Sequence, residues 1–270
     1  MSRLFYVVFV SLALVLVPLL ESKELISISA VNYPPFQIEK ISSDGKKGFS
    51  IEIVEKAFKK ADENIELKYV PMTRASWSLF DKGSTGLVGT IKWLDSSGKL
   101  DLVEAVDLHL IRFVLFYKKS NFPNGVSYSD LGELKEYKIG TVRGSSTVST
   151  LEKKGLNLDY VSDIELNFRK LEAGRVDFVA AVDLAGWDII KELFPKSTEQ
   201  FEAVETPFFV ANSSLMFKKE DNEVIQSFKK GLKEIVENGE YIDIVRKYYG
   251  NEIDVNSVLP DHIKQGIDKK

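Results

Sequence analysis

Strand-like and helical segments alternate along most of this sequence, and the alternation starts twice. Such a pattern is typical of α/β layers, in which helices cover a largely parallel sheet. The first series predicts strands at 25–31, 65–70 and 85–91 and helices at 50–61 and 73–83. The second series predicts strands at 137–142, 158–161 and 176–182 and helices from about 146, at 164–174 and at 185–194. Ser50 is the expected N-cap of the first helix.

Two longer apolar segments, 109–119 and 208–219, flank the second series, and two amphipathic helices follow at 222–239 and 241–250. We therefore expect an α/β protein of two lobes, joined by two crossover strands with a ligand cleft between them. Residues 23–116 form the first part of lobe 1, 117–208 form lobe 2, and 209–270 form the second part of lobe 1.

Residues 1–22 resemble a secretory signal, because Arg3 precedes the uncharged apolar run 4–20. The cleavage pattern is weak, which leaves an uncleaved membrane anchor as the alternative, although Pro18 and the short run favour cleavage. We therefore expect a periplasmic protein. The absence of cysteine argues against a lipid anchor, disulfides and thiol chemistry, and the net charge of −4 does not favour nucleic acid.

The segment KIGTVRGSSTVSTLEKKG, residues 138–155, places Arg143, Ser145 and Ser146 at a strand-to-helix junction. The first turn of a helix has unpaired N–H groups and the positive end of the helix dipole, so this junction suits an anion. In the alternative interpretation, one serine simply caps the helix.

Five motifs occur in an order that resembles one family, the bacterial extracellular solute-binding proteins of family 3, the polar amino acid type. They are YPPF, GFSIEIVEKAF, KIGTVRGSS, KLEAGRVD and FKKGLKEIVENGEYIDIVRKYYG, and together they span nearly all of the chain after residue 22. The resemblance implies a Venus-flytrap fold, in which two α/β lobes, the first discontinuous, close on a small solute for an ATP-driven importer.

The resemblance also implies ligand-binding residues. Tyr33 matches an aromatic residue that covers the ligand, although it could instead be a packing ring beside Phe36. Ser145 and Ser146 match positions that receive the ligand carboxylate, and Thr90 matches a hydroxyl or main-chain contact at the end of the third strand.

The arginine that grips the α-carboxylate in the family is missing, since Ser97 stands at its position. Lys92, Arg74 and Arg143 are the candidate replacements, but a lysine lacks the two-pronged guanidinium geometry. For each of the three, an ordinary solvated surface charge is the better default interpretation.

Asp183 is the candidate for binding the α-amino group of the ligand. It lies one residue beyond the spacing that is usual in the family, and a shift of one residue along a strand turns a side chain to the opposite face of the sheet. Trp77 or Trp93 is expected in the cleft wall, and Trp77 is the one we include in the site.

The leading hypothesis is a binding protein without chemistry of its own, which takes an amino-acid-like solute and delivers it to an ABC permease. A role as the ligand-sensing partner of a membrane receptor is a second possibility. The third is an enzyme on the same fold, similar to cyclohexadienyl dehydratase. His109 and His262 are far apart in the sequence and form no metal or triad pattern, although Glu52 or Asp183 could act as a carboxylate acid or base. We expect no cofactor, no metal and a monomer.

Overall fold

The computed structural model describes residues 25–41, 43–81, 83–143, 145 and 147–267. The expected signal, residues 1–22, lies outside the described residues, as does Ser146. The strands are β1 (Ile26–Ala30), β2 (Ile65–Tyr69), β3 (Gly86–Gly89), β4 (Val103–Lys118), β5 (Lys138–Val142), β6 (Asn157–Val161), β7 (Phe178–Val182), β8 (Phe201–Ala203) and β9 (Phe209–Lys218). The α-helices are α1 (Phe49–Lys60), α2 (Ala75–Phe80), α3 (Val148–Lys153), α4 (Ile164–Glu172), α5 (Asp183–Leu193), α6 (Asn222–Asn238), α7 (Glu240–Tyr249) and α8 (Asp261–Ile267).

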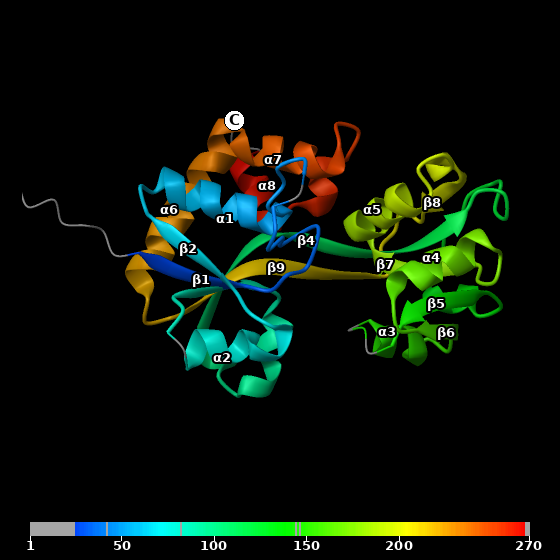
Figure 1. The fold of residues 1–270 in the computed structure, drawn as a ribbon, viewed down its shortest axis with the longest axis horizontal. Coiled ribbons are helices and arrows are strands. Elements are labelled where there is room, and N and C mark those ends of the chain that lie inside the picture. The colour runs from blue at the N-terminus through cyan, green and yellow to red at the C-terminus, as the bar shows by residue number, and fades with distance from the viewer. Residues whose placement is uncertain (1–24, 42, 82, 144, 146, 268–270) are drawn as a thin grey trace, which may run out of the picture.

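The strands follow one another in the order β2-β1-β3-β9-β4-β7-β5-β6, and β8 pairs with β4. β1 is parallel to β2 and β3, and β5 is parallel to β6 and β7, whereas β4 and β9 run antiparallel to their neighbours. Figure 1 shows the result as two lobes side by side, with β4 and β9 passing from one to the other. The prediction of a two-lobed α/β fold with two crossover strands is confirmed.

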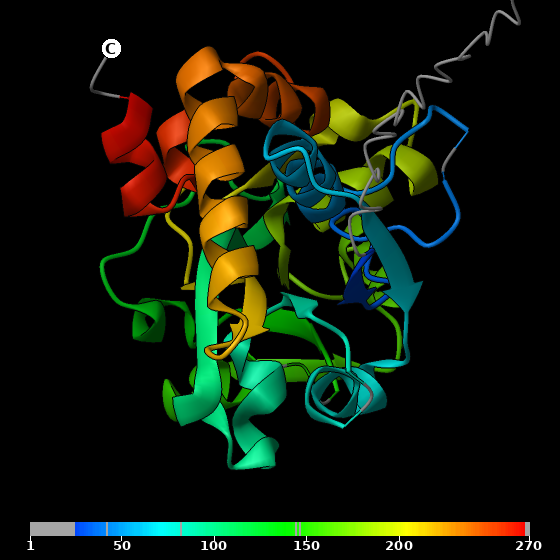
Figure 2. The ribbon, with the colours of Figure 1, turned by 90° about the vertical axis from the view of Figure 1, so that its left-hand side faces the viewer.

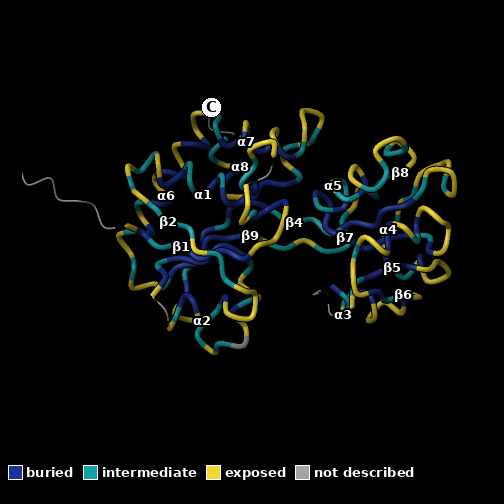
Figure 3. Tube along the Cα trace, viewed as in Figure 1, coloured by how far each residue is buried: buried dark blue, intermediate teal, exposed yellow. Residues whose placement is uncertain are grey.

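Each lobe has apolar cores on both faces of its part of the sheet. In lobe 1, α1, α6, α7 and α8 cover one face and α2 covers the other (Figures 1 and 2). In lobe 2, α4 and α5 pack on one face, and α3 packs on the other. Figure 3 shows the buried chain concentrated along the strands and the inner helix faces. The expected division at residues 116/117 and 208/209 stays a prediction.

The crossover strand β4 begins at Val103, six residues before the start that the sequence predicts. Its register against β9 shifts between Asp107 and His109, so Leu108 is an extra residue on β4. Beyond this bulge, the stretch from Phe113 pairs with β7 of lobe 2. A single strand therefore contributes to both lobes.

The prediction that Ser50 caps the first helix is wrong. α1 begins at Phe49, and Gly48, with a φ of 109°, is its N-cap residue. Because Ser50 then lies inside the first turn, its side chain turns to the sheet, where its Oγ lies 2.7 Å from Nε2 of His109 and 3.2 Å from Oγ of Ser213.

Candidate ligand-binding site

The carboxyl ends of two pairs of parallel strands, one pair in each lobe, point to the junction between the lobes. β3 runs beside β9 with Gly89 opposite Ser214, so its end is directed along β9 toward Phe209. β7 runs the other way, with Val182 opposite Phe113. Because β1 is parallel to β3, and β5 to β7, the segments after all four strands lie at the junction, where open α/β sheets bind ligands.

Tyr33 and Trp77 present aromatic surface from lobe 1. Tyr33 follows β1, lies 36% exposed, and stacks on the buried ring of Phe36 with a centroid distance of 5.9 Å. The packing of this ring beside Phe36 is therefore observed, and its role in covering a ligand stays a prediction. Trp77, on α2, is 41% exposed, and the guanidinium of Arg74 lies 6.0 Å from its ring centroid.

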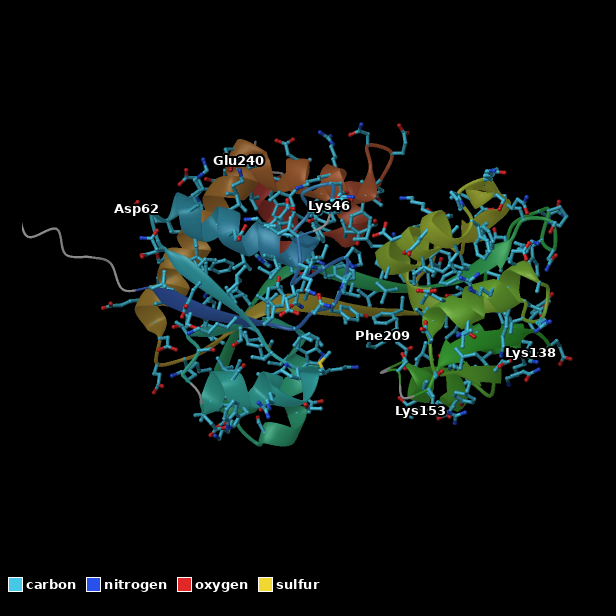
Figure 4. All side chains as sticks on the ribbon, viewed as in Figure 1. Lys46, Asp62, Lys138, Lys153, Phe209 and Glu240 are labelled. Atoms are coloured by element: carbon cyan, nitrogen blue, oxygen red, sulfur yellow. The ribbon has the colours of Figure 1, made fainter. Side chains whose placement is uncertain are left out.

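Thr90 and Lys92 mark the end of β3. Thr90 is the extended N-cap residue of a 3-10 helix, Ile91–Ser97, and its carbonyl accepts a hydrogen bond from the N–H of Trp93. Nζ of Lys92 lies 4.4 Å from the ring centroid of Phe209, the first residue of β9. Figure 4 places Phe209 between the two lobes, so the ammonium group of Lys92 also lies at the junction.

The other two tryptophans pack inside their lobes. Trp93 packs against the apolar cluster beneath α2, where its ring fills the space above Gly89. Trp187 meets Phe116 edge to face at 5.4 Å within lobe 2. Of the two tryptophans expected at the cleft wall, Trp77 is therefore the exposed one.

Arg143 and Ser145 stand at the end of β5 in lobe 2. The guanidinium of Arg143 lies 5.4 Å from the ring centroid of Tyr160. Oγ of Ser145 lies 3.1 Å from Oγ1 of Thr147, which is the N-cap residue of α3 but makes no side-chain capping bond. The helix is only six residues long, so the contribution of its dipole is smaller than a full helix would give.

Asp183 directly follows β7, and its carboxylate forms a buried ion pair. Its Oδ2 is 3.3 Å from Nη1 of Arg112, and each side chain is 12% exposed. The same Nη1 donates to Oγ of Ser257 at 3.2 Å, and Nη2 donates to the carbonyl of Glu205 at 2.6 Å. Burial raises the pKa of Asp183, and the charge of Arg112 opposes this effect. The carboxylate thus pairs with Arg112, and its role toward a ligand stays a prediction.

Sequence reasoning missed Arg112. The residue lies on the predicted crossover strand, so its position was foreseeable, but its partners come from the start of α5, from the loop before β9 and from the C-terminal segment. Only the strand alternation, which puts a charge between the apolar Ile111 and Phe113, signals that this side chain turns away from the core.

Neither histidine contributes a group at this junction. His109 is fully buried between Phe36 and Phe49, and burial lowers its pKa to about 4. His262 lies on α8, at a separate hollow of about 460 Å³ between β4, α6 and α8. No group of three or more potential metal ligands occurs in the part of the chain that the structure describes.

A pocket of about 430 Å³ adjoins the junction on lobe 1. The ends of β1 and β2 and the residues after them line it, including Asn32, Glu39, Tyr69 and Met72. Among residues 25–267, leaving out the four undescribed positions, every helix is too short or too polar to span a bilayer.

The fold and the direction of its strand ends define the class: this is the two-lobed periplasmic-binding-protein fold, and the resemblance noted in the sequence is confirmed. The chain is 25% identical over 241 residues to the arginine-binding extracellular protein ArtP of Bacillus subtilis, covering 85% of this chain and 88% of that protein. No protein-family model matches the sequence.

Solved structures agree with this class. The L-cystine solute receptor of Neisseria gonorrhoeae is 18% identical with a TM-score of 0.68, covering 87% of this chain and 96% of the receptor. A histidine kinase sensor domain similar to periplasmic binding proteins is also 18% identical, with a TM-score of 0.61, covering 88% of this chain and 98% of the domain.

Proposed function

We propose that this chain is an exported solute-binding protein that closes on a small amino-acid-like solute and presents it to an ABC importer. The observation that carries the proposal is the pair of crossover strands, β4 and β9, which join two lobes that each have their own cores. The similarity to ArtP over most of both chains supports an amino-acid-like solute.

The mechanism is a shift between open and closed arrangements of the lobes. A solute that contacts residues of both lobes binds the closed arrangement better, and this difference in affinity drives closure. Lobe 1 offers Tyr33, Trp77, Thr90 and the cations Arg74 and Lys92, and lobe 2 offers Arg143 and Ser145. Asp183 of lobe 2 and Ser146, which lies outside the described residues, complete the proposed set.

The proposal includes no bond-breaking step, so the solute should be released unchanged. The protein would act as a monomer outside the cytoplasmic membrane. No histidine of the described chain lies at the junction, and the two carboxylates considered for acid or base chemistry have other partners. Glu52 binds Lys247 and Tyr248, and Asp183 binds Arg112.

Ligand-dependent stability tests the proposal. The purified protein is unfolded and refolded to remove any bound solute, and its melting temperature is then measured against amino acids, polyamines and organic acids. A ligand at a hundred times its Kd adds about 2.7 kcal/mol, a shift of several degrees. Small-angle scattering should show a smaller radius of gyration with the same ligand, and mass spectrometry should recover it unchanged. Turnover would instead support the enzyme hypothesis.

A sensing role is the second candidate, because the kinase sensor domain shares the fold over most of this chain. Pull-down from membranes of the native host, with and without the ligand identified above, separates the two roles: an ABC permease indicates transport, and a receptor indicates sensing.

A further inference from the structure

Exposed apolar side chains gather on the face of lobe 1 that adjoins the junction. Those with large exposed surface come from five different segments: Tyr33 after β1, Met72 before α2, Trp77 on α2, Ile91 after β3 and Val210 on β9. We call these five residues the apolar patch. Contiguous exposed apolar surface on a soluble protein commonly marks a binding site.

The segments that carry the apolar patch contact one another. Met72 lines the 430 Å³ pocket together with Asn32, the neighbour of Tyr33 in the chain. α2, which carries Trp77, packs against the 3-10 helix that begins at Ile91, and that helix packs against β9. The five exposed side chains of the patch are therefore carried by neighbouring segments of the fold.

Two cations already occupy aromatic faces at this surface. Arg74 lies over Trp77 and Lys92 lies over Phe209, and neither cation forms an ion pair with any residue that the structure describes. A second cation is repelled from a ring that already holds one, whereas a carboxylate is attracted to the unpaired charge. The surface thus combines an apolar area with a cationic edge.

We infer that the solute carries an uncharged apolar or aromatic body together with a carboxylate, as in the aromatic and large aliphatic amino acids, and not a cationic side chain such as that of arginine. The inference rests on the proposed function, because it assigns a ligand class to the same site. The body lies on the apolar patch, and the carboxylate faces Lys92 and Arg74.

The test measures Kd by calorimetry on the refolded protein for L-phenylalanine, L-tryptophan and L-leucine, against L-arginine, L-lysine and L-glutamate. Phenylalaninamide, which lacks the carboxylate, is the matched probe for the cationic edge. We expect phenylalanine, tryptophan or leucine to bind at least about 10-fold more tightly than arginine, and the amide to bind more weakly than phenylalanine.

Two pairs of variants localise the effect. Trp77→Ala should weaken binding about 10-fold, whereas Leu166→Ala, which removes a similarly exposed apolar side chain on α4, should leave Kd within 2-fold. Lys92→Gln should weaken binding of phenylalanine but not of its amide. Lys99→Gln, which removes a similar cation from the ring of Phe80, should change neither.

The outcomes separate this inference from the proposed function. Preference for arginine, lysine or glutamate, or an unchanged Kd in Trp77→Ala, overturns the ligand class and leaves the binding function standing. Absence of binding by every amino acid and carboxylate overturns both.

Discussion

At the scale of single residues, His109 gives the molecule a defined sensitivity to acid. Its Nδ1 lies 3.2 Å from the carbonyl of Leu110, which can only accept, so Nδ1 carries the proton and Nε2 accepts from Ser50. Burial lowers its pKa from 6.5 to about 4, so the folded protein holds this ring neutral while the unfolded chain protonates it. Above pH 6.5 the ring is neutral in both states, so it does not lower the free energy of unfolding. As pH falls from 6.5 toward 4, the unfolded chain takes up a proton that the folded protein does not, and the free energy of unfolding decreases.

We therefore expect the free energy of unfolding to fall by about 3 kcal/mol between pH 7 and pH 4 through His109. Urea denaturation at several pH values measures the slope. Burial also lowers the pKa of His262, so His262→Gln serves as the control and should leave the part of the slope that His109 contributes. A wild-type profile flat from pH 7 to 5 would contradict the assignment.

Asn167 is a second residue whose side chain should lower the stability of the folded protein. It is fully buried on α4, and neither amide atom has a hydrogen-bond partner in the described part of the protein. The side chain rests against β5 at Gly140, where an added Cβ would lie 2.7 Å from Oδ1. Burying unpaired polar atoms is unfavourable, so the similarly sized Asn167→Leu should raise stability by about 1 kcal/mol.

Differential scanning calorimetry should show a Tm about 2–4 °C higher for Asn167→Leu. Asn212→Leu is the control at an exposed position, where the amide donates to Asp107 and its loss should bring no gain. A lower Tm for Asn167→Leu would indicate that a bound water satisfies the amide in solution.

At the scale of elements, the packing of α6 on α1 depends on Gly231. A Cβ at this position would clash with the carbonyl oxygen of Ala57, so the two helices approach along their backbones. Alanine is the better helix former by about 1 kcal/mol, yet Gly231→Ala should destabilise the protein by about 1–3 kcal/mol, because steric overlap exceeds the gain in propensity.

Chemical denaturation of Gly231→Ala measures this loss. The adjacent Lys230→Ala lies on the exposed side of the same helix and should stay within about 0.5 kcal/mol of the native chain. A higher free energy of unfolding for Gly231→Ala than for the native chain would contradict the close backbone contact between α6 and α1.

The same scale shows what sequence patterns can predict. Among the described residues, the periodic spacing of apolar residues located the strands other than β8 and the α-helices other than α8, because those elements bury one regular face. β8 has only three residues and pairs with the outer end of β4, so its period is too short to detect. The early start of β4 was missed because Glu104 and Asp107 interrupt its apolar pattern.

At the scale of the whole molecule, Arg112 connects parts of the chain that lie in different lobes. It binds Asp183 at the start of α5, Ser257 near the C-terminus and Glu205 before β9. Removing one charge leaves the other buried and unpaired, so Asp183→Asn or Arg112→Met should each cost about 3 kcal/mol. The double variant should cost less than the sum of the two.

A double-mutant cycle measures this coupling, which we expect to be at least about 1 kcal/mol. The exposed helical pair Lys233 and Glu237 is the control and should couple by less than about 0.5 kcal/mol. Additive losses for Arg112 and Asp183 would show that the contact contributes no stability.

The candidate site was only partly predictable, because several of its contacts join segments that are distant in the sequence. Tyr33, Thr90 and Ser145 follow strands, and the topology fixes where strand ends lie. The partner of Asp183 was not predictable, because a one-residue difference in where β7 ends decides which way the carboxylate points. The aromatic partners of Arg74, Lys92 and Arg143 likewise depend on how separate segments pack.

Because β4 and β9 are neighbouring antiparallel strands, lobe 2 is also an insertion within a β-hairpin. Ile111 of β4 lies directly opposite Ala211 of β9. The chain between these two residues, which includes lobe 2, therefore begins and ends at adjacent positions of the sheet. A tight turn joining the two positions would close β4 and β9 as an ordinary β-hairpin. The gene for this protein could therefore be cut at two codons to remove one lobe or to exchange it for another, with the remaining sheet keeping its strand order.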